Sequence, residues 1–371
     1  MHADDLADYR RQHVPLYNAN RLKLGVFGTN VSGGGTITSA PTGFAPTFEH
    51  NLEIALRAEQ LGFEFLIPFG RWRSFGGVTD YNGNCMEVYT WAAALAARTE
   101  QIMLFATSHV PTVHPIVAAK QGATIDHISH GRWGLNVVCG WYGPEMEMFG
   151  ARQLEHDDRY GRAAEWLTVI KRLWSESGFD HAGEYYQVKD GYLEPKPVQQ
   201  TYPVVVNAGA SEAGREFSAR HVDFNFISMD SCASGASLAA DVRRRAHAHG
   251  RQIGVLGYGF MLVRDTEAEA QAAFDAILAK GDRAAAENIM RTLGMESESF
   301  GAQIDRFVQR FVAGWGGYAL IGTPEMVVDQ LLELERSGIE GMALIWHDYA
   351  NEIAYFGERV LPLLRQAGLR I

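Results

Sequence analysis

The feature that most constrains the fold of this chain is an alternation of short apolar runs with longer amphipathic segments, which continues from residue 22 to the end. Such an alternation is typical of parallel strands joined by crossover helices. Eight of the runs have the length and composition of strands: 22–28, 63–67, 102–107, 133–138, 203–207, 223–228, 254–263 and 342–346. Eight strands with helices between them favour a closed (β/α)8 barrel over an open doubly wound sheet.

The segments between these runs have helical signals. Apolar residues recur at helical spacing in 163–174 and in 327–334, and these faces are expected to pack on the sheet. Thr323-Pro324-Glu325 predicts the start of a helix, because it combines an N-cap residue, a first-turn proline and an acid at the positive end of the helix dipole. The pattern therefore predicts an α/β chain whose helices cover a parallel sheet.

Three connections are longer than an ordinary barrel loop, and long loops in compact domains are usually functional or disordered. The segments 69–87 and 280–318 follow predicted strands, so we expect them on the catalytic face of the barrel. The segment 178–202 lies between a helix and a strand, and a rim or an oligomer contact explains it equally well. We predict one barrel domain with insertions over residues 22–371, preceded by an N-terminal extension over residues 1–21.

Composition and charge exclude several function classes. Lys and Arg number 33 against 44 Asp and Glu, a formal net charge of -11, so the chain lacks the electrostatic footprint of a nucleic-acid-binding protein. No stretch approaches the ~20 apolar residues of a membrane span, and residues 1–21 lack the apolar core of a signal peptide. The three cysteines have neither disulfide nor zinc spacing, which favours a reducing cytoplasm.

The segment 123–141, with the sequence ATIDHISHGRWGLNVVCGW, is the most informative stretch. A helix end, a glycine turn and a buried strand would account for most of it. This structural interpretation does not explain Asn136, because burying a side-chain amide in a barrel strand without hydrogen-bond partners costs ~1–3 kcal/mol of stability. A polar heterocycle or a dioxygen site in the barrel mouth would supply the missing partners.

Two further segments are candidates for binding. Ala208-Gly209-Ala210-Ser211 follows the fifth predicted strand and opens a helix, where backbone N–H groups and a hydroxyl suit a phosphate, although a short glycine turn with an N-cap serine is the commoner explanation. Thr107 ends the third strand, where its hydroxyl either points into the mouth or bonds back to the strand end. The thirteen histidines show no metal-ligand spacing, and no G-x-S-x-G elbow is present, so we predict no metal site and no hydrolase triad.

These segments resemble the bacterial-luciferase-like flavin monooxygenases, in the branch that holds pyrimidine and dimethylsulfone monooxygenases. The likeness begins with ATIDHISHGRWGLNVVCGW and continues in LEHDDRYGRAAEWL, NAGASEAGREFSARHVDFNF, VRDTEAEA, LIGTPEMV and YFGERVLPLL. It covers about residues 22 to 365 with the motifs in the family's order. The fold implied by this resemblance is the same single (β/α)8 barrel.

The resemblance also implies a cofactor and its contacts. It places the phosphate of FMN, delivered as FMNH2, at the turn that holds Gly209 and Ser211. It identifies Thr107 and Asn136 as the catalytic pair around dioxygen beside the reduced flavin. The remaining implied cofactor contacts are Gly70, Arg71, Glu145, Arg159 and Tyr160, with Asn136 as a contact as well.

The substrate is less constrained by the sequence. Aromatic residues near the predicted strand ends would hold a flat or apolar molecule, although they serve barrel packing equally well. The candidates for substrate contact are Phe75, His109, Trp141, Trp346 and His347. Phe260 stands where the resembled alkanesulfonate monooxygenases have a histidine, which argues against an alkanesulfonate and leaves a pyrimidine or cyclic amide and a sulfone open.

The function implied is that of a two-component monooxygenase, which uses dioxygen to oxidise and cleave a small organic substrate through a flavin peroxide. A separate flavin reductase would supply FMNH2 from NADH or NADPH, and a homodimer or homotetramer is expected. Two alternatives remain: an oxidoreductase that uses a flavin or a deazaflavin without dioxygen, and a non-catalytic flavin-binding subunit. The substrate, the bond cleaved and the position of the peroxide on the flavin stay open at this point.

Overall fold

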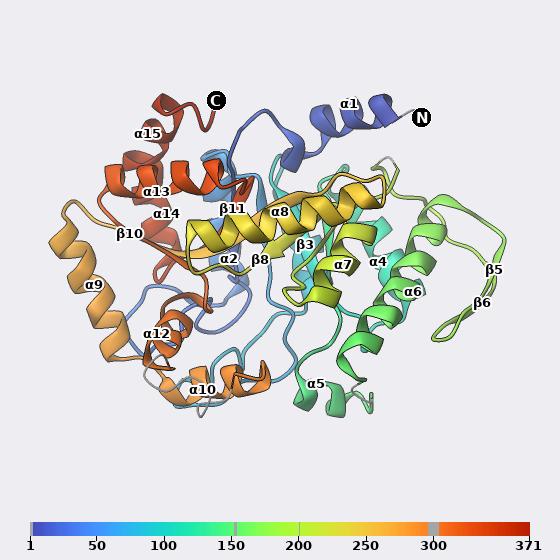
Figure 1. The fold of residues 1–371 in the computed structure, drawn as a ribbon, viewed down its shortest axis with the longest axis horizontal. Coiled ribbons are helices and arrows are strands. Elements are labelled where there is room, and N and C mark those ends of the chain that lie inside the picture. The colour runs from blue at the N-terminus through green and yellow to red at the C-terminus, as the bar shows by residue number, and fades with distance from the viewer. Residues whose placement is uncertain (1–2, 152–153, 200, 296–303) are drawn as a thin grey trace. The chain divides into compact units, whose positions relative to one another are not determined.

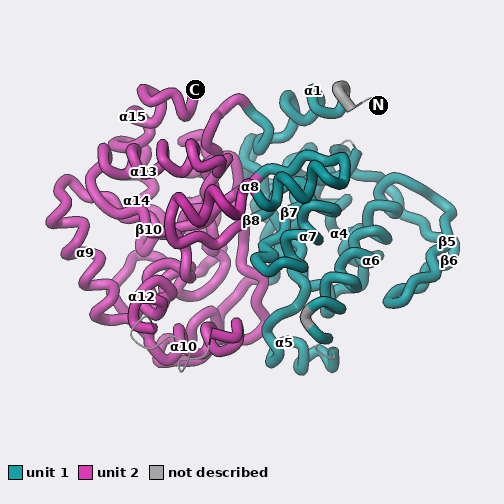
Figure 2. Tube along the Cα trace, viewed as in Figure 1, with its two compact units in different colours: residues 1–18, 87–226, 241–254 teal, residues 19–86, 227–240, 255–371 magenta. Residues whose placement is uncertain are grey.

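The computed structural model describes residues 3–151, 154–199, 201–295 and 304–371. The chain forms two compact units, each built from segments that are distant in the sequence (Figure 2). Unit 1 consists of residues 1–18, 87–226 and 241–254, and unit 2 consists of residues 19–86, 227–240 and 255–371. The boundary expected at residue 21 and the single domain over 22–371 stay predictions.

Unit 1 contains four parallel strands in the order β3 (Met103–His109), β4 (Trp133–Val138), β7 (Val204–Asn207) and β8 (Phe224–Ile227). Their register places Thr107 opposite Asn136 and Asn207 opposite Asn225. The strands are almost wholly buried, as expected for parallel strands with both faces covered. Polar side chains at matching positions of neighbouring strands therefore meet inside the protein.

The helices of unit 1 follow these strands. They are α1 (Ala3–His13), the short 3-10 helix η1 (Pro15–Tyr17), α3 (Val88–Ala96), α4 (Pro115–Ile128), α5 (Gly143–Met148), α6 (His156–Ser175), α7 (Glu212–His221) and the end of α8 (Cys232–Ala248). Helix α6 packs on α4 through two buried tryptophans whose indole N–H groups donate to backbone oxygens of Val113 and Ala119. These are Trp166 and Trp174, and the second lies on the apolar face predicted from the sequence.

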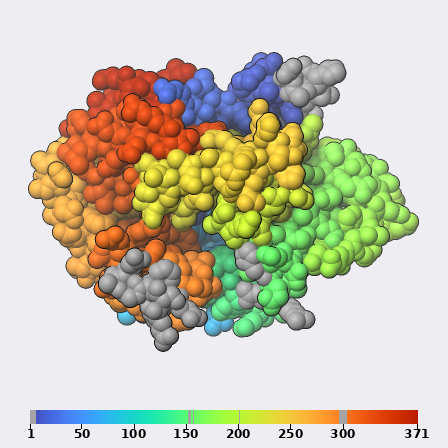
Figure 3. Space-filling view, viewed as in Figure 1, coloured from blue at the N-terminus to red at the C-terminus, as the bar shows by residue number. Residues whose placement is uncertain are grey.

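The insertion over 178–202 contains an antiparallel hairpin, β5 (Phe179–Ala182) and β6 (Gln187–Gly191), which lies beside α6 (Figure 1). The Glu165 carboxylate on α6 accepts hydrogen bonds from the backbone N–H groups of Tyr185 and Tyr186, and it contacts the His181 ring at 3.0 Å. The hairpin and α6 form the green surface in Figure 3. Its role as a rim or an oligomer contact stays a prediction.

Unit 2 contains five parallel strands in the order β10 (Tyr318–Gly322), β9 (Gly254–Val263), β11 (Gly341–Ile345), β1 (Lys23–Phe27) and β2 (Phe65–Ile67). Strand β10 is not among the predicted strands, and only its first residue, Tyr318, lies in the long segment 280–318. The other four match predicted strands. Thr323 caps the next helix by accepting a hydrogen bond from Met326 N, as the Thr-Pro-Glu signal predicts.

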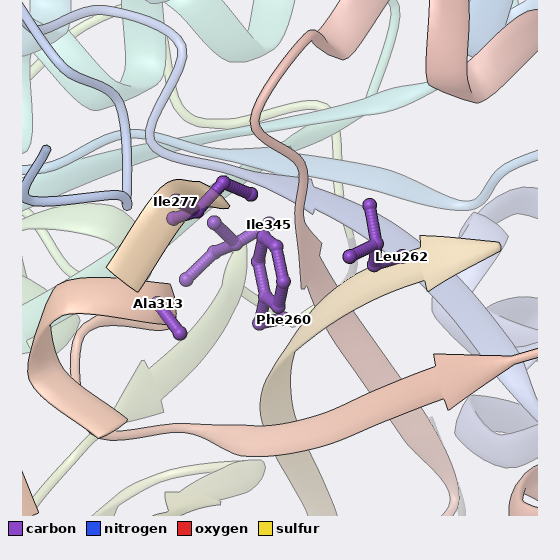
Figure 4. Close-up of a cluster of buried hydrophobic side chains, with 5 residues drawn as sticks. All are labelled: Phe260, Leu262, Ile277, Ala313 and Ile345. Carbon is purple, nitrogen blue, oxygen red and sulfur yellow. The ribbon is translucent and has the colours of Figure 1, made fainter. Parts of the chain in front are cut away.

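The helices of unit 2 surround these strands. They are α2 (Phe48–Gln60), α9 (Glu267–Ala279), α10 (Arg283–Thr292), α12 (Ile304–Gly314), α13 (Pro324–Arg336), α14 (Tyr349–Arg359) and α15 (Leu361–Gln366). A buried apolar cluster joins β9 and β11 to α9 and α12 (Figure 4). Its members are Phe260, Leu262, Ile277, Ala313 and Ile345. Phe260 is 1% exposed and therefore has a packing role.

All eight strands predicted from the sequence are present: β1, β2, β3, β4, β7, β8, β9 and β11. They are parallel, and helices connect them, so the fold class is the predicted (β/α)8 barrel. That prediction is confirmed. In such a barrel the chemistry belongs at the carboxyl ends of the strands, where Thr107, Val138 and Asn207 lie.

Candidate active site

The first element of the site is a pair of polar side chains on β3 and β4. The Asn136 amide nitrogen donates a hydrogen bond to Thr107 Oγ1 at 3.1 Å, and the two side chains are 7% and 5% exposed. The Asn136 Oδ1 atom is buried and has no hydrogen-bond partner among the described residues. A buried acceptor without a donor costs ~1–3 kcal/mol. The pair that the sequence singles out is therefore brought together, with one acceptor available to a bound molecule.

The second element joins α6 to the turn before α7. Ser211 is the N-cap of α7 and its hydroxyl accepts a hydrogen bond from Gly214 N at 3.1 Å. Tyr160 on α6 makes a side-chain hydrogen bond with Ser211. The adjacent Arg159 donates through one terminal nitrogen to the Gly140 carbonyl at 3.0 Å, just after β4. The structure thus brings Tyr160 to Ser211 at the α7 N-terminus, 51 positions away in the sequence, with the Arg159 guanidinium acting on the same tyrosine from α6.

This second element suits an anion. The Arg159 Nε–H is buried without a hydrogen-bond acceptor among the described residues, although a guanidinium normally satisfies its donors. A Cβ at Gly209 would stand 2.6 Å from Asn207 Oδ1 and 2.7 Å from the Gly214 Cα, so the turn admits only glycine there. The positive end of α7 and an arginine match the donor set of a phosphate site.

Burial shifts the pKa values of two ionisable side chains near Arg159. Burial raises the pKa of the Cys139 thiol to about 12, while the nearby Arg159 guanidinium works in the opposite direction. Burial also raises the pKa of Tyr160, which the hydrogen bond with Ser211 partly opposes. Both groups are therefore neutral at physiological pH. Arg159 is left as the positive charge among these three side chains.

A buried polar network lies directly behind the turn, and the sequence prediction missed it. Asn207, the last residue of β7, accepts hydrogen bonds at Oδ1 from Gly209 N and from Ser218 Oγ. Asn225 on β8 donates to both Asn207 O and Ser218 Oγ. The signal was available, because Asn207 and Asn225 are amides within apolar strand runs, as Asn136 is.

The other predicted contacts of unit 1 lie near the ends of the same strands. Glu145, on α5, is fully buried, and His109 ends β3 with an exposure of 2%. The His109 carbonyl accepts hydrogen bonds from the backbone and side chain of Thr112. Trp141 follows β4 and packs against Tyr142 with ring centroids 5.8 Å apart. The positions agree with cofactor or substrate contact, and these roles stay predictions.

In unit 2, the predicted cofactor residues Gly70 and Arg71 follow β2 and are buried. The Arg71 guanidinium lies 5.1 Å from the centroid of the Phe75 ring. Phe75 is in turn held by Trp315, with ring centroids 5.3 Å apart, and by a hydrogen bond from the Asn288 amide to its carbonyl. The 69–87 segment is thus an ordered, aromatic loop after a strand end.

Two residues predicted to face the substrate have other partners in unit 2. Trp346 is 1% exposed and its ring packs against Phe63, Tyr349 and Phe356. Barrel packing, the alternative named for these aromatics, accounts for this position. The His347 ring contacts Thr36 Oγ1 at 3.3 Å and Pro41 O at 2.9 Å, so it anchors the loop after β1.

The described residues contain neither a metal-ligand cluster nor a membrane-spanning helix. No cluster of three or more His, Cys, Asp or Glu side chains has the geometry to hold a metal ion within residues 3–151, 154–199, 201–295 and 304–371. Within the same part of the chain, none of the helices combines the length and the apolar character that a membrane crossing requires.

Comparison with known proteins places these residues in a family. The chain is 31% identical to an FMNH(2)-dependent dimethylsulfone monooxygenase of Pseudomonas putida over 93% of its length and 96% of the relative's. It is 32% identical to the pyrimidine monooxygenase RutA of Serratia proteamaculans, again over 93% and 96% of the two chains. Its fold matches the crystal structure of a long-chain alkane monooxygenase, LadA, with a TM-score of 0.85, 22% identity and coverage of 95% and 93%.

The family model for luciferase-like monooxygenases matches residues 22–341. This range contains the Thr107–Asn136 pair, the Arg159–Ser211 corner and seven of the eight predicted strands in full. The predicted family and the predicted class of enzyme, a flavin-dependent monooxygenase, are confirmed by these matches. The chain belongs to the luciferase-like monooxygenase family.

Proposed function

We propose that this protein is the oxygenase component of a two-component system that uses FMNH2 and dioxygen to oxidise and cleave a small organic molecule. The observation that carries the proposal is the corner of Arg159, Tyr160 and Ser211, beside the strands that hold Thr107 and Asn136. The corner offers an anion site, and the strand pair offers a buried hydrogen-bond acceptor. This division suits a flavin, which has a phosphate at one end and a redox-active heterocycle at the other.

The residues of the site have separate roles in the proposed reaction. The α7 N-terminus and Arg159 would hold the phosphate of FMN through charge-assisted hydrogen bonds. The Asn136 carbonyl oxygen would accept a hydrogen bond from the flavin ring, and its amide fixes the Thr107 side chain at 3.1 Å. When bound, the reduced flavin supplies the electrons that activate dioxygen. The protein positions the reactants and keeps water from them.

The substrate and partners belong to the proposal as well. Dimethylsulfone and pyrimidines are the substrates named for the two relatives, and either a sulfone or a pyrimidine or cyclic amide is proposed here. His109 and Trp141 are the proposed contacts in unit 1, and Phe75 is the one in unit 2. An NAD(P)H:flavin reductase is the proposed partner, in a homodimeric or homotetrameric assembly in the cytoplasm. The three cysteines form no disulfide among the described residues, which agrees with a reducing compartment.

Oxygen uptake tests the proposal directly. The purified chain is combined with FMN, NADH and a flavin reductase, and a panel of pyrimidines, cyclic amides, sulfones and sulfonates is added. We expect product formation, identified by mass, with one class of the panel. FMN binding without any substrate-dependent product would instead support a non-catalytic flavin-binding subunit.

Anaerobic titration distinguishes the remaining alternative. An oxygenase component that takes up reduced flavin and releases oxidised flavin should bind FMNH2 more tightly than oxidised FMN. Equal affinity for the two forms, or preference for a reduced deazaflavin, would contradict a two-component oxygenase. The titration needs no knowledge of the substrate, so it is independent of the oxygen-uptake assay.

A further inference from the structure

The β4–β7 strand pair is fastened by a side-chain amide at each end. At the amino ends, the Gln199 amide nitrogen donates to the Trp133 carbonyl at 2.6 Å. At the carboxyl ends, the Asn207 amide nitrogen donates to the Val137 carbonyl, also at 2.6 Å. Both side chains are almost fully buried, with exposures of 2% and 3%. The two amides therefore fasten the same strand pair, and the Gln199 amide nitrogen additionally donates to Asp126 Oδ1 at 2.6 Å, a contact remote from the 208–211 turn in the sequence.

Asn207 differs from Gln199 because it also reaches the anion-binding turn, residues 208–211. Its Oδ1 accepts from Gly209 N at 2.8 Å and from Ser218 Oγ at 3.0 Å. Ser218 lies on α7, the helix whose N-terminus forms the site. One side chain thus connects β4, the backbone of the turn and the helix behind it.

Asn225 fixes this connection from β8. Its amide nitrogen donates to Asn207 O at 2.9 Å and to Ser218 Oγ at 3.0 Å, and both Asn225 and Ser218 are fully buried. Around the turn there is no spare room, since a Cβ at Gly214 would stand 2.6 Å from the Tyr160 hydroxyl. The direction of the turn's N–H groups is consequently set by Asn207 and its buried partners. A small shift there would move the donors relative to an anion.

We infer that Asn207 is a positioning residue that holds the 208–211 turn in its anion-binding form and thereby sets the preference of the site for a phosphorylated flavin. The inference rests on the proposed function, because it takes the anion to be the phosphate of FMN. Asn207 acts through the turn: its own hydrogen-bonding atoms are used by Val137, Gly209 and Ser218. The consequence is a selectivity between FMN and riboflavin that depends on a side chain behind the site.

Equilibrium binding of reduced FMN and reduced riboflavin to the full chain tests the inference. The measured quantity is the ratio of the two dissociation constants, in the wild type, in Asn207→Ala and in Gln199→Leu. We expect Asn207→Ala to lower the preference for FMN about tenfold, as loss of well-placed charge-assisted hydrogen bonds does, with riboflavin binding little changed. Gln199→Leu should reduce thermal stability and leave the ratio at its wild-type value.

The outcomes are distinct. An unchanged ratio in Asn207→Ala, or an equal fall in Gln199→Leu, would overturn the positioning role and leave strand fastening. If Asn207→Ala does not fold, Ser218→Ala retains Asn207 and removes one of its partners, and a smaller fall in the same ratio is expected; no fall would overturn the inference. Wild-type protein that binds neither flavin, or that lacks any preference for FMN, would instead overturn the proposed function.

Discussion

At the scale of single residues, the proposed oxygen chemistry depends on the Thr107 hydroxyl and the Asn136 amide, which are joined by one hydrogen bond. Thr107→Val keeps nearly the same volume and removes the hydroxyl, and Asn136→Ala removes the amide. We expect both variants to fold and to bind reduced FMN, with weaker binding in Asn136→Ala. Flavin oxidation should continue while product yield per flavin falls and hydrogen peroxide rises. A normal yield in both variants would return the two residues to a purely structural role.

Arg159 gives a second prediction at this scale. Arg159→Ala removes the guanidinium that donates to the Gly140 carbonyl and has a buried Nε–H without an acceptor among the described residues, and we expect reduced FMN to bind more weakly by ~1.5–3 kcal/mol, the range for a hydrogen bond to a charged group. Arg159→Lys is the matched control, because it keeps the charge and loses the planar fork, so an intermediate affinity is expected. Unchanged FMN affinity in the alanine variant would show that the phosphate lies elsewhere.

Residue patterns predicted part of this site and not the rest, for a physical reason. Thr107, Asn136, Arg159 and Ser211 lie within motifs, and a motif preserves local spacing, which a fold then brings together. The Asn207–Asn225 contact depends on the register between two strands, which no local pattern specifies. Trp346 is an example of a residue whose position in the sequence predicted a substrate contact that the packing does not favour. It lies at a strand end, but its ring packs against Phe63 and Phe356.

At the scale of elements, the chain's last residues fasten the start of the unit 2 sheet. The Arg370 guanidinium donates to Glu64 Oε2 at 2.9 Å, and the side chains are 4% and 1% exposed. The same carboxylate accepts from Leu24 N on β1 and from the Asn20 amide. Helix α15 therefore ends in a tail that is tied to β1 through one buried carboxylate.

We predict that Arg370→Met lowers the free energy of unfolding by ~3–5 kcal/mol, because it leaves the Glu64 charge buried with fewer partners. Denaturant unfolding measures the change. In the double variant Arg370→Met with Glu64→Gln, the charge is absent and the amide can still accept from Leu24 N, so part of the loss should be recovered. A double variant as unstable as the sum of its single variants would show that the pair acts through packing alone.

The strand pattern, in contrast, was almost fully predictable at this scale. Buried parallel strands are continuous apolar runs of Val, Leu and Ile, which stand out against the helical segments on either side. The short strand β10 and the hairpin β5–β6 escaped prediction because the first is only a short run beside a helix start and the second alternates polar and apolar residues in an insertion. Both are additions to the barrel's repeating order.

At the scale of the whole molecule, we expect the free energy of unfolding to vary with pH in the alkaline range because of Lys171. Burial lowers the pKa of this ammonium from its ordinary 10.5 to about 8, with Arg10 and Arg251 acting in the same direction and Asp223 opposing. The ammonium donates to the His221 carbonyl and lies 4.3 Å from the Tyr202 ring centroid. The unfolded chain therefore binds more protons than the folded chain between these two pKa values.

Because the unfolded state binds the extra proton, the free energy of unfolding should rise as the pH increases from about 8 toward 10.5. Below pH 8 both states are protonated and Lys171 contributes no slope. Chemical denaturation at pH 7.5, 8.5 and 9.5 measures the effect, which should reach about 1–3 kcal/mol. Lys171→Met should remove that part of the pH dependence, and an identical slope in the variant would contradict the assignment.

The interleaving of the two units has a consequence for synthesis on the ribosome. Strand β1, near the start of the chain, pairs with β11 at Gly341–Ile345, close to its end. A nascent chain therefore carries β1 with an unsatisfied edge until translation is nearly complete. Such edges are sites of wrong pairing between chains. We expect the time between the emergence of β1 and the release of the chain to be when this protein most needs protection by chaperones, and early termination to produce aggregates instead of a stable half.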